Sequence, residues 1–530
     1  MEPVSASRSP WTNRTGADRI ARGSLAAIAA FAVACSSFTT WHPHLLHTDD
    51  SYFYYEVALH LAHGDGSRFH SFSSTNGFHP LWEAVCTTLV VLGADRASLP
   101  YIAVALANAM SCASLALVAW ALRANGVRNV AIGLGAFAAY AFFTTMGLEG
   151  QLLAFLLSMA LFVVRAPEPS LARNFAFHTI LAFAVLARLD AIFVCGCLSI
   201  ARIAAPSRHR LFDHLLVAST PYLILVGGYV AWNAMAFGHP VPISGRIKTS
   251  VTGRGIPDIA AAAGVVTIVS AIVVGRLSRA SFLRQTCLAL GAGVALHAGL
   301  LSTVLHGGGQ IWYYFSWYIV LAFVAPVALH ATDRTLRAKG FRSLAVALGI
   351  GSSLLGGAIP FLFVASHRPR IGLDGLTTIV SQIDRARLPE GTSIFVYDLP
   401  GAMGYLAGLD VVPADGLMSD ATYDELVAAE GIERYLASRG IRFFMGRGPI
   451  VSRGEPKDHC STPSLYNGST LFRCRAIDER RYRVVSAAIR TPLSGRFVGD
   501  LVLGEDAVVD TFEFDGRSYA VWRLDSPTPP

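Results

Sequence analysis

The sequence predicts a polytopic α-helical membrane protein with a soluble α/β domain at its C-terminal end. Of its 530 residues, 53% are hydrophobic and only 15% are charged, whereas soluble domains carry about 25% charged residues. The apolar residues are concentrated in 24–366, and the segment 368–530 has the composition of a soluble domain. We therefore expect a cytoplasmic N-terminus (1–23), a membrane domain (24–367) and an extracytoplasmic domain (368–530).

Twelve apolar blocks mark the expected membrane helices. They cover residues 24–42, 79–94, 98–122, 129–145, 149–165, 174–187, 190–204, 213–236, 258–276, 282–305, 312–331 and 342–366. A membrane span needs about 20 apolar residues, so the shorter blocks are candidates for re-entrant or half-helices. We expect 11 crossings, with 13 as the alternative, because an odd number brings the C-terminal domain to the side opposite the N-terminus.

Basic residues orient these helices. They cluster in the loops 165–173, 202–210, 276–284 and 334–342. By the positive-inside rule these ends are cytoplasmic, and the net charge of +7 is a topology signal rather than evidence for nucleic-acid binding. The C-terminal domain then lies outside, where Cys460 and Cys474 are expected to form a disulfide. The other six cysteines lie in apolar blocks and are expected to be packing residues.

The C-terminal domain shows a βα rhythm in its first half. We expect strands at 393–397, 409–412 and 441–445, a short helix after Pro400-Gly401 and a longer helix at 422–438. Residues 470–525 are expected to be rich in β-strands. This pattern predicts an α/β domain that continues into antiparallel strands.

Two adjacent carboxylates follow the first apolar block. Asp49 and Asp50 lie in the outer loop 43–80, directly before an aromatic cluster at 52–55. Acids at the end of a membrane helix are costly unless they serve a function, and a general base must lie where it can meet its substrate. The alternative is two solvated acids beside an interfacial aromatic belt. Residues 51–63 would then form an amphipathic helix on the membrane surface.

Other charged residues interrupt the apolar pattern at ends that we expect to face outward. Glu149 either offsets a helix dipole or contacts a substrate. Arg188 and Asp190 form either an intramembrane ion pair or a substrate or phosphate contact. Arg246 and Lys248 follow a Gly- and Pro-containing turn on the outer side, against the positive-inside trend, which favours an anionic ligand such as phosphate.

Aromatic and polar side chains mark a further outer corner. Trp312 and Tyr313 follow the polar segment 306–310, and their rings either stack on a sugar or belong to an interfacial belt. His79 and Asn76 lie in the outer loop and are candidates for substrate contacts, although single histidines are commonly structural.

These motifs in combination resemble those of bacterial GT-C glycosyltransferases, the polyprenyl-phosphate-sugar-dependent arabinosyl- and mannosyltransferase-like membrane proteins. The resemblance covers most of residues 45–320 and, weakly, the C-terminal domain. The motifs that carry it are Asp49-Asp50, Gly64-Asp65-Gly66, Thr75-Asn76-Gly77-Phe78-His79-Pro80-Leu81-Trp82, Gly147-Leu148-Glu149, Leu186-Ala187-Arg188-Leu189-Asp190 and Pro242-Ile243-Ser244-Gly245-Arg246-Ile247-Lys248.

The resemblance implies a hexosyl- or pentosyltransferase of the bacterial cytoplasmic membrane. Its donor would be a polyprenyl-phosphate-linked sugar, and its acceptor a glycan, lipid or protein of the cell envelope. Asp50 or Asp49 would be the base of an inverting displacement. Arg246 and Lys248, with Arg188, would stabilise the leaving phosphate. The other candidate substrate-binding residues are Asn76, His79, Glu149, Asp190, Trp312 and Tyr313.

The sequence leaves two alternatives, one for the cofactor and one for the function. Some relatives use a divalent cation, which Asp49 and Asp50 are candidates to hold, and no other cofactor is implied. A transporter or flippase for a lipid-linked saccharide, or a non-catalytic assembly scaffold, is the alternative function. A transporter predicts functional charges near the bilayer midplane in two related halves, and a scaffold predicts that both aspartates are dispensable.

Overall fold

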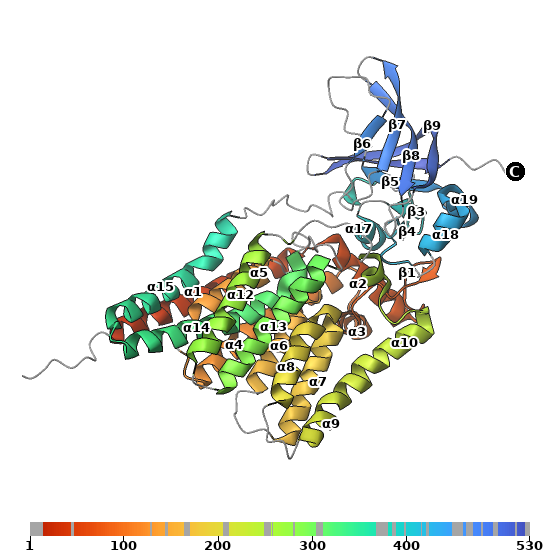
Figure 1. Cartoon of the computed structure of the whole chain (residues 1–530). Helices are drawn as coiled ribbons and strands as arrows, with labels where there is room; N and C mark the ends of the chain where they lie inside the picture. The colour runs from red at the N-terminus through yellow and green to blue at the C-terminus, as the bar shows by residue number, and fades with distance from the viewer. Residues whose placement is uncertain are drawn as a thin grey trace, which may run out of the picture.

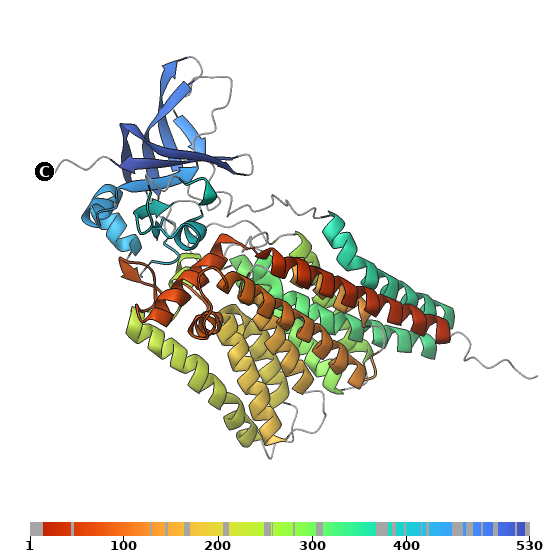
Figure 2. The ribbon, with the colours of Figure 1, turned by 180° about the vertical axis from the view of Figure 1, so that it is seen from behind.

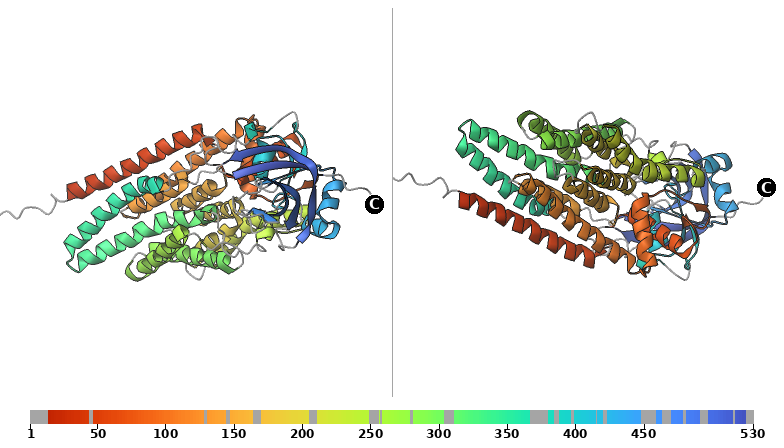
Figure 3. Two further views of the ribbon diagram at one scale, coloured as in Figure 1. Left: turned by 90° about the horizontal axis from the view of Figure 1, so that it is seen from above. Right: turned by 90° about the horizontal axis from the view of Figure 1, so that it is seen from below.

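The structure is a computed structural model in which a helical bundle carries a smaller α/β domain at one end (Figure 1). It describes residues 14–43, 47–127, 130–143, 147–163, 170–204, 211–248, 256, 258–278, 281–303, 311–366, 380–383, 388–396, 399–414, 416–419, 423–447, 459–462, 470–478, 481–490, 497–514 and 517–524. Viewed from above and below, the long helices run side by side, with the strands of the C-terminal domain gathered at one end (Figure 3).

The bundle is built from the apolar blocks of the sequence. Its elements are α1 (Arg14–Trp41), α4 (Leu99–Ala124), α5 (Ala131–Phe143), α6 (Gly150–Val163), α7 (Leu171–Ala187), α8 (Ile192–Ile203), α9 (Leu211–Pro221), the π-helix η4 (Tyr222–Gly227), α10 (Gly228–Phe237), α12 (Asp258–Leu277), α13 (Ser281–Thr303), the 3₁₀ turn η5 (Ile311–Tyr314), α14 (Phe315–Ala338) and α15 (Arg342–Ser366). Within the described part of the chain, seven helices are long and apolar enough to cross a membrane, and four shorter apolar helices accompany them.

Large apolar side chains point outward from this bundle as well as inward. Leu223 is 71% exposed and Met235 80% exposed, which suits contact with lipid rather than water. Inside the bundle, small residues let helices approach closely. A Cβ on Gly135 of α5 would overlap the backbone of Gly356 in α15, the kind of small-residue contact that packs membrane helices. Figure 2 shows α1 lying along α15 on the rear face.

Short elements connect the bundle at the end that carries the C-terminal domain. They are α2 (Asp49–His63), β1 (Arg68–His70), β2 (Ser73–Ser74), α3 (Pro80–Val91), the 3₁₀ turn η2 (Leu189–Ala191) and α11 (Ile243–Lys248). Helix α2 ends at Gly64, which has the positive φ of 85° that glycine adopts without strain. Helix α3 starts with Pro80 at its first turn, where the missing N–H costs nothing.

The environment of α2 differs from the expected membrane-surface helix. Every residue from Ser51 to Leu59 is buried, whereas a surface helix would bury only one face. The rings of Tyr52 and Tyr55 pack against Tyr405 of the C-terminal domain, while other faces of α2 contact the bundle. The interfacial aromatic belt is therefore wrong for this cluster, because the C-terminal domain covers the side that would otherwise face water or lipid.

The C-terminal domain contains α17 (Pro400–Tyr405), α18 (Tyr423–Glu430), α19 (Ile432–Ser438) and one eight-stranded sheet. Its strands are β3 (Ser393–Val396), β4 (Asp410–Pro413), β5 (Phe443–Arg447), β6 (His459–Thr462), β7 (Thr470–Asp478), β8 (Arg481–Arg490), β9 (Phe497–Phe514) and β10 (Arg517–Leu524), in the order β4-β3-β5-β10-β9-β8-β7-β6. Strand β3 pairs in parallel with β4 and β5, and the remaining pairs are antiparallel.

Two expectations for this domain are refined. The single helix at 422–438 is two helices, because Gly431 between them has a φ of 80° that is incompatible with a continuous helix. Cys460 in β6 pairs with Phe472, two residues before Cys474 in the neighbouring β7. The side chains of both cysteines lie outside the described residues, so their disulfide stays a prediction.

Candidate active site

A pocket opens at the end of the bundle that carries the C-terminal domain, beneath that domain. Side chains from α2, the loop before α3, the turn before α6, the α7–η2 junction, α11, η5 and the turn after β4 line it. The lining residues are Asp50, Phe53, Tyr54, Gly77, Phe78, His79, Leu148, Glu149, Arg188, Ser244, Trp312, Tyr313, Leu417 and Met418. The pocket thus brings together six of the residues that the sequence singled out, although they come from segments up to 263 residues apart.

The two adjacent aspartates have different surroundings. The carboxylate of Asp49 accepts hydrogen bonds from the backbone N–H groups of Gly401 (3.1 Å) and Ala402 (2.8 Å). It therefore caps the first turn of α17, whose own preceding residue, Leu399, makes no side-chain cap. Asp50 instead lines the pocket, as expected for residues about 100° apart around a helix.

A buried network of charged side chains forms one wall. Arg188 donates to Glu149 (Nη1 to Oε1, 2.5 Å) and makes a two-point contact with Asp190 (Nε to Oδ1, 2.9 Å; Nη2 to Oδ2, 2.8 Å). The side chains of Arg188 and Glu149 are each only 3% exposed. Removing one member of such a group would leave a buried charge unpaired, at a cost of about 3–5 kcal/mol. The network is therefore a rigid part of the site.

The network keeps its acids ionised despite burial. Burial alone would raise the pKa of Glu149, but His79 and Arg188 hold this pKa below its usual value. The pKa of Asp190 lies well below its usual range because Arg188 and His297 outweigh its burial. His297 accepts a hydrogen bond from the Trp317 indole at Nδ1 (3.0 Å), so a neutral ring carries its proton on Nε2, 3.4 Å from Asp190.

Tyr54 links the network to the outer loop. Its hydroxyl donates to Glu149 Oε2 (3.0 Å) and accepts from the backbone N–H of His79 (3.3 Å). Burial, followed by the charge of Glu149, raises the pKa of Tyr54, so the hydroxyl remains a donor. The His79 ring lies 3.7 Å from Glu149 and is 25% exposed, which leaves it accessible from the pocket.

Asn76 connects the outer loop to the segment that follows α10. Its amide donates to Asn233 (3.1 Å), and its oxygen accepts from the backbone N–H of Ile243 (2.9 Å). Both ends of the buried amide are thus used within the protein. The result is that Ser244, the next residue after Ile243, lines the pocket, and Asn76 positions this wall.

Of the predicted phosphate-binding cations, Arg246 is not among the residues that line the pocket, although Ser244 of the same helix is. Arg246 is partly buried, and its Nη1 contacts His239 Nε2 at 2.8 Å. The side chain of Lys248 and the segment 304–310 lie outside the described residues. Their roles in phosphate and sugar recognition remain predictions.

Trp312 and Tyr313 form an aromatic wall. Their rings are nearly parallel, at an interplanar angle of 22° and a centroid distance of 6.4 Å. The guanidinium of Arg188 lies 5.0 Å from the centre of the Tyr313 ring, within cation–π range. This contact joins the aromatic wall to the charged network.

The C-terminal domain supplies the roof of the pocket through Leu417 and Met418. A Cβ on Gly77 would overlap the carbonyl oxygen of Leu417, so only glycine permits this approach. Docking is reinforced nearby by Arg96, which donates to the Tyr405 carbonyl (2.6 Å) and pairs with Glu56 (2.6 and 2.9 Å).

The candidate cation site at Asp49 and Asp50 does not match a complete ligand set. Both carboxylate oxygens of Asp49 already accept backbone hydrogen bonds. Within the part of the chain that the structure describes, no group of three or more His, Cys, Asp or Glu side chains could hold a metal ion. A protein-held divalent cation at the aspartate pair therefore remains a hypothesis without a ligand set.

No family profile matches the chain, and no curated protein matches it either. Structural comparison finds similar solved structures. The chain is similar to ArnT from Cupriavidus metallidurans bound to undecaprenyl phosphate, with a TM-score of 0.46 and 14% identity over 80% of this chain and 96% of ArnT. It is also similar to the apo state of ArnT, with a TM-score of 0.44 and 15% identity over 79% of this chain and 92% of ArnT.

A third similar structure is the arabinofuranosyltransferase AftD from Mycobacteria, with a TM-score of 0.48 and 15% identity. The match covers 79% of this chain and 35% of AftD. All these TM-scores lie below 0.5.

Several residues of the pocket and of its charged network were not singled out from the sequence. Tyr54 was included only as a member of an aromatic cluster, and Ser244 only as part of a motif. The sequence gives no reason to assign Leu417 and Met418 to a binding site, because apolar residues in a soluble domain usually belong to its hydrophobic core. His297 lies in an apolar block, and a polar, ionisable residue within such a block is the feature that could have indicated a functional role.

Proposed function

We propose that the chain is a membrane glycosyltransferase that moves a sugar from a polyprenyl-phosphate donor to a cell-envelope acceptor on the outer side of the cytoplasmic membrane. The observation that supports the proposal is that the side chains of Asp49 and Asp50 have different surroundings. One carboxylate caps α17 of the C-terminal domain, and its neighbour lines a pocket with a charged network, an aromatic wall and a roof.

Asp50 is the base in this mechanism. Its carboxylate takes the proton of the acceptor hydroxyl as that oxygen attacks the anomeric carbon of the donor sugar. The new glycosidic C–O bond forms as the bond from the anomeric carbon to the phosphate oxygen breaks. Attack from the face opposite the leaving group inverts the anomeric configuration, and polyprenyl phosphate leaves with the bonding electron pair.

The charges of the pocket suggest where the phosphate lies. Arg188 is engaged by both Glu149 and Asp190, so the wall that it belongs to carries no excess positive charge. A phosphate would be repelled by these carboxylates and by Asp50. We therefore assign the phosphate to the side formed by Ser244, with Arg246 beside it, where a cation stabilises the developing charge.

The remaining pocket residues would hold the sugar. A flat pair of rings such as Trp312 and Tyr313 offers a face on which a sugar ring packs. His79 and Glu149 offer polar groups in the same pocket, and the rigid network fixes their positions. Such fixed positions favour a defined attack geometry.

The test is transfer of radiolabelled sugar from a panel of polyprenyl-phosphate donors by purified full-length protein. Asp50→Asn should reduce the transfer rate by about two to four orders of magnitude, the usual contribution of general base catalysis. Asp65→Asn is the matched control, because Asp65 is an exposed acid on the same outer segment and does not line the pocket. It should retain transfer.

The outcomes separate the alternatives. Full transfer by folded Asp50→Asn would refute the catalytic assignment. Absence of transfer by the wild type across the donor panel, together with Asp50-dependent movement of lipid-linked saccharide across vesicles, would support the transporter. Inactivity in both assays would favour the scaffold.

A further inference from the structure

A second pocket lies between three membrane helices, far from the candidate active site. It is lined by Phe177 of α7, by Leu198, Ala201 and Arg202 of α8, and by Phe282, Gln285 and Thr286 of α13. Helix α8 starts next to Asp190 and rises about 1.5 Å per residue, so Arg202 lies roughly 18 Å along it from the first site. This pocket is at the end of the bundle that the basic loops predict to be cytoplasmic.

Arg202 is the polar centre of this pocket. It is only 7% exposed. Its Nε donates to Asn174 Oδ1 (2.9 Å), and the amide of Asn174 contacts His214 Nδ1 (2.6 Å). These buried contacts fix the orientation of the guanidinium. Its Nη2 is buried and has no hydrogen-bond partner among the described residues.

A buried guanidinium nitrogen without a partner is costly, and a partner from outside the chain would remove this cost. Arg173, a second cation, acts electrostatically on Arg202, so the local field favours an anion. A planar guanidinium that is fixed at Nε by Asn174 and has a nitrogen without a hydrogen-bond partner in the described part of the chain is suited to a phosphate oxygen.

The remaining walls indicate what the anion is attached to. Phe177, Leu198 and Phe282 are apolar, whereas Gln285 and Thr286 supply polar groups. Ile200 of α8 and Phe212 of the adjacent α9 are 68% and 70% exposed, as expected for surfaces that meet lipid. A ligand with a phosphate head and hydrocarbon chains would satisfy both kinds of wall.

We propose that this pocket binds the phosphate of an anionic phospholipid from the leaflet opposite the candidate active site. Anionic lipids are enriched in the cytoplasmic leaflet, and basic pockets between membrane helices are known to take their head groups. The proposal does not depend on the glycosyltransferase assignment, because none of its residues belongs to the outer pocket.

The position of the pocket gives the lipid a structural role. The same three helices carry or adjoin the charged network at their other ends: α7 ends at Arg188, α8 follows Asp190, and α13 contains His297. A lipid phosphate on Arg202 would hold α7, α8 and α13 together. It would therefore stabilise the bundle that positions the outer site.

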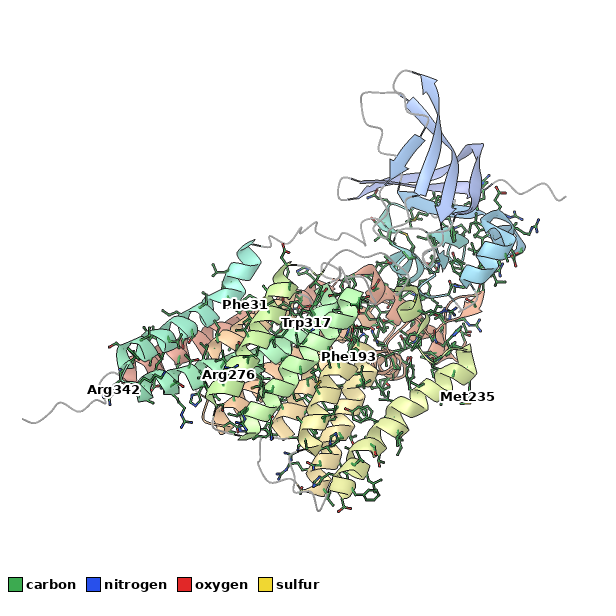
Figure 4. All side chains as sticks on the ribbon, in the orientation of Figure 1. Phe31, Phe193, Met235, Arg276, Trp317 and Arg342 are labelled. Atoms are coloured by element: carbon green, nitrogen blue, oxygen red, sulfur yellow. The ribbon has the colours of Figure 1, made fainter. Side chains whose placement is uncertain are left out.

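Native mass spectrometry of the full-length protein in detergent tests the proposal, with phosphatidylglycerol, phosphatidylcholine and inorganic phosphate as the added ligands. Phosphatidylglycerol should bind more tightly than phosphatidylcholine. Arg202→Gln should weaken phosphatidylglycerol binding by about tenfold or more, as expected for loss of a hydrogen bond to a charged group. Arg276→Gln should leave binding unchanged, since Arg276 is an exposed cation toward the same end of the bundle (Figure 4).

Ala201→Phe provides a second variant that keeps the charge and fills the pocket, so that misfolding of Arg202→Gln does not decide the outcome. It should abolish phosphatidylglycerol binding while thermal unfolding remains cooperative. Equal binding of phosphatidylcholine, or equal losses in Arg202→Gln and Arg276→Gln, would overturn the proposal. Inorganic phosphate that binds as tightly as phosphatidylglycerol and depends equally on Arg202 would replace the lipid with a free anion.

Discussion

The contact between Asp49 and α17 predicts that one side chain controls how the C-terminal domain docks. Asp49→Ala removes two hydrogen bonds from a carboxylate to backbone N–H groups, at 3.1 and 2.8 Å. A helix N-cap contributes about 1 kcal/mol, and a hydrogen bond to a charged group about 1.5–3 kcal/mol. Because Asp49 is only partly buried, we expect a loss of about 2–4 kcal/mol, which is below the roughly 3–6 kcal/mol that two such hydrogen bonds would contribute at full strength.

This loss corresponds to a shift of roughly 30- to 700-fold in the local docking equilibrium. Hydrogen exchange measured by mass spectrometry reports it directly, because the amides of Gly401 and Ala402 lose their acceptor. Exchange of peptides covering α17 should accelerate by that factor, with a smaller change for Asp49→Asn, whose neutral amide oxygen still accepts a hydrogen bond. Asp50→Ala is the control and should leave α17 protected.

Two results would refute this reasoning. Unchanged exchange of α17 in Asp49→Ala would mean that the capping contact contributes nothing to docking. Equal acceleration in Asp50→Ala would mean that the two aspartates do not have separate roles.

Three further predictions follow from the site. Gly77→Ala should lower transfer activity and loosen the roof, because its methyl group overlaps the Leu417 carbonyl; hydrogen exchange at 416–419 that matches the wild type would contradict this. The difference in Tm between wild type and Glu149→Gln should be constant above about pH 5.5 and should become smaller as the pH falls below about 4.5, the ordinary pKa of a glutamate. The reason is that the pKa of Glu149 is lowered in the folded state. Its ionised carboxylate therefore stabilises the folded protein at pH values above the unfolded-state pKa, and this stabilisation is lost as acid protonates the group. A Tm difference that instead widens on acidification would contradict the ion-pair assignment. Chelation with EDTA should leave transfer intact, since Asp49 is engaged by α17; loss of transfer that added Mg²⁺ or Mn²⁺ restores would establish a metal requirement.

Much of the fold could be predicted because it depends on local composition. Apolar runs of sufficient length become helices in a membrane, since lipid offers no partner for unsatisfied backbone groups. The block at 342–366 matches α15 in both bounds, and the block at 98–122 matches α4 within two residues. The strand predicted at 409–412 likewise corresponds to β4.

The parts that could not be predicted depend on contacts between distant segments. Adjacent carboxylates have the same sequence signal, so only the approach of α17 distinguishes Asp49 from Asp50. The aromatic cluster at 52–55 has the composition of a membrane-interface belt, and it is buried because a domain some 350 residues later covers it. Asn76 was expected to contact substrate, whereas both ends of its amide are bonded within the protein.

The roof of the outer pocket has a consequence for the order in which the protein matures. Synthesis and membrane insertion proceed from the N-terminus, so α2 and the charged network emerge long before residues 400–418. Until that last third of the chain has been made and has folded, Asp49 lacks its partner and the pocket lacks Leu417 and Met418. A partly synthesised chain would therefore have a pocket without its roof, and activity would begin only when the C-terminal domain has folded onto the bundle.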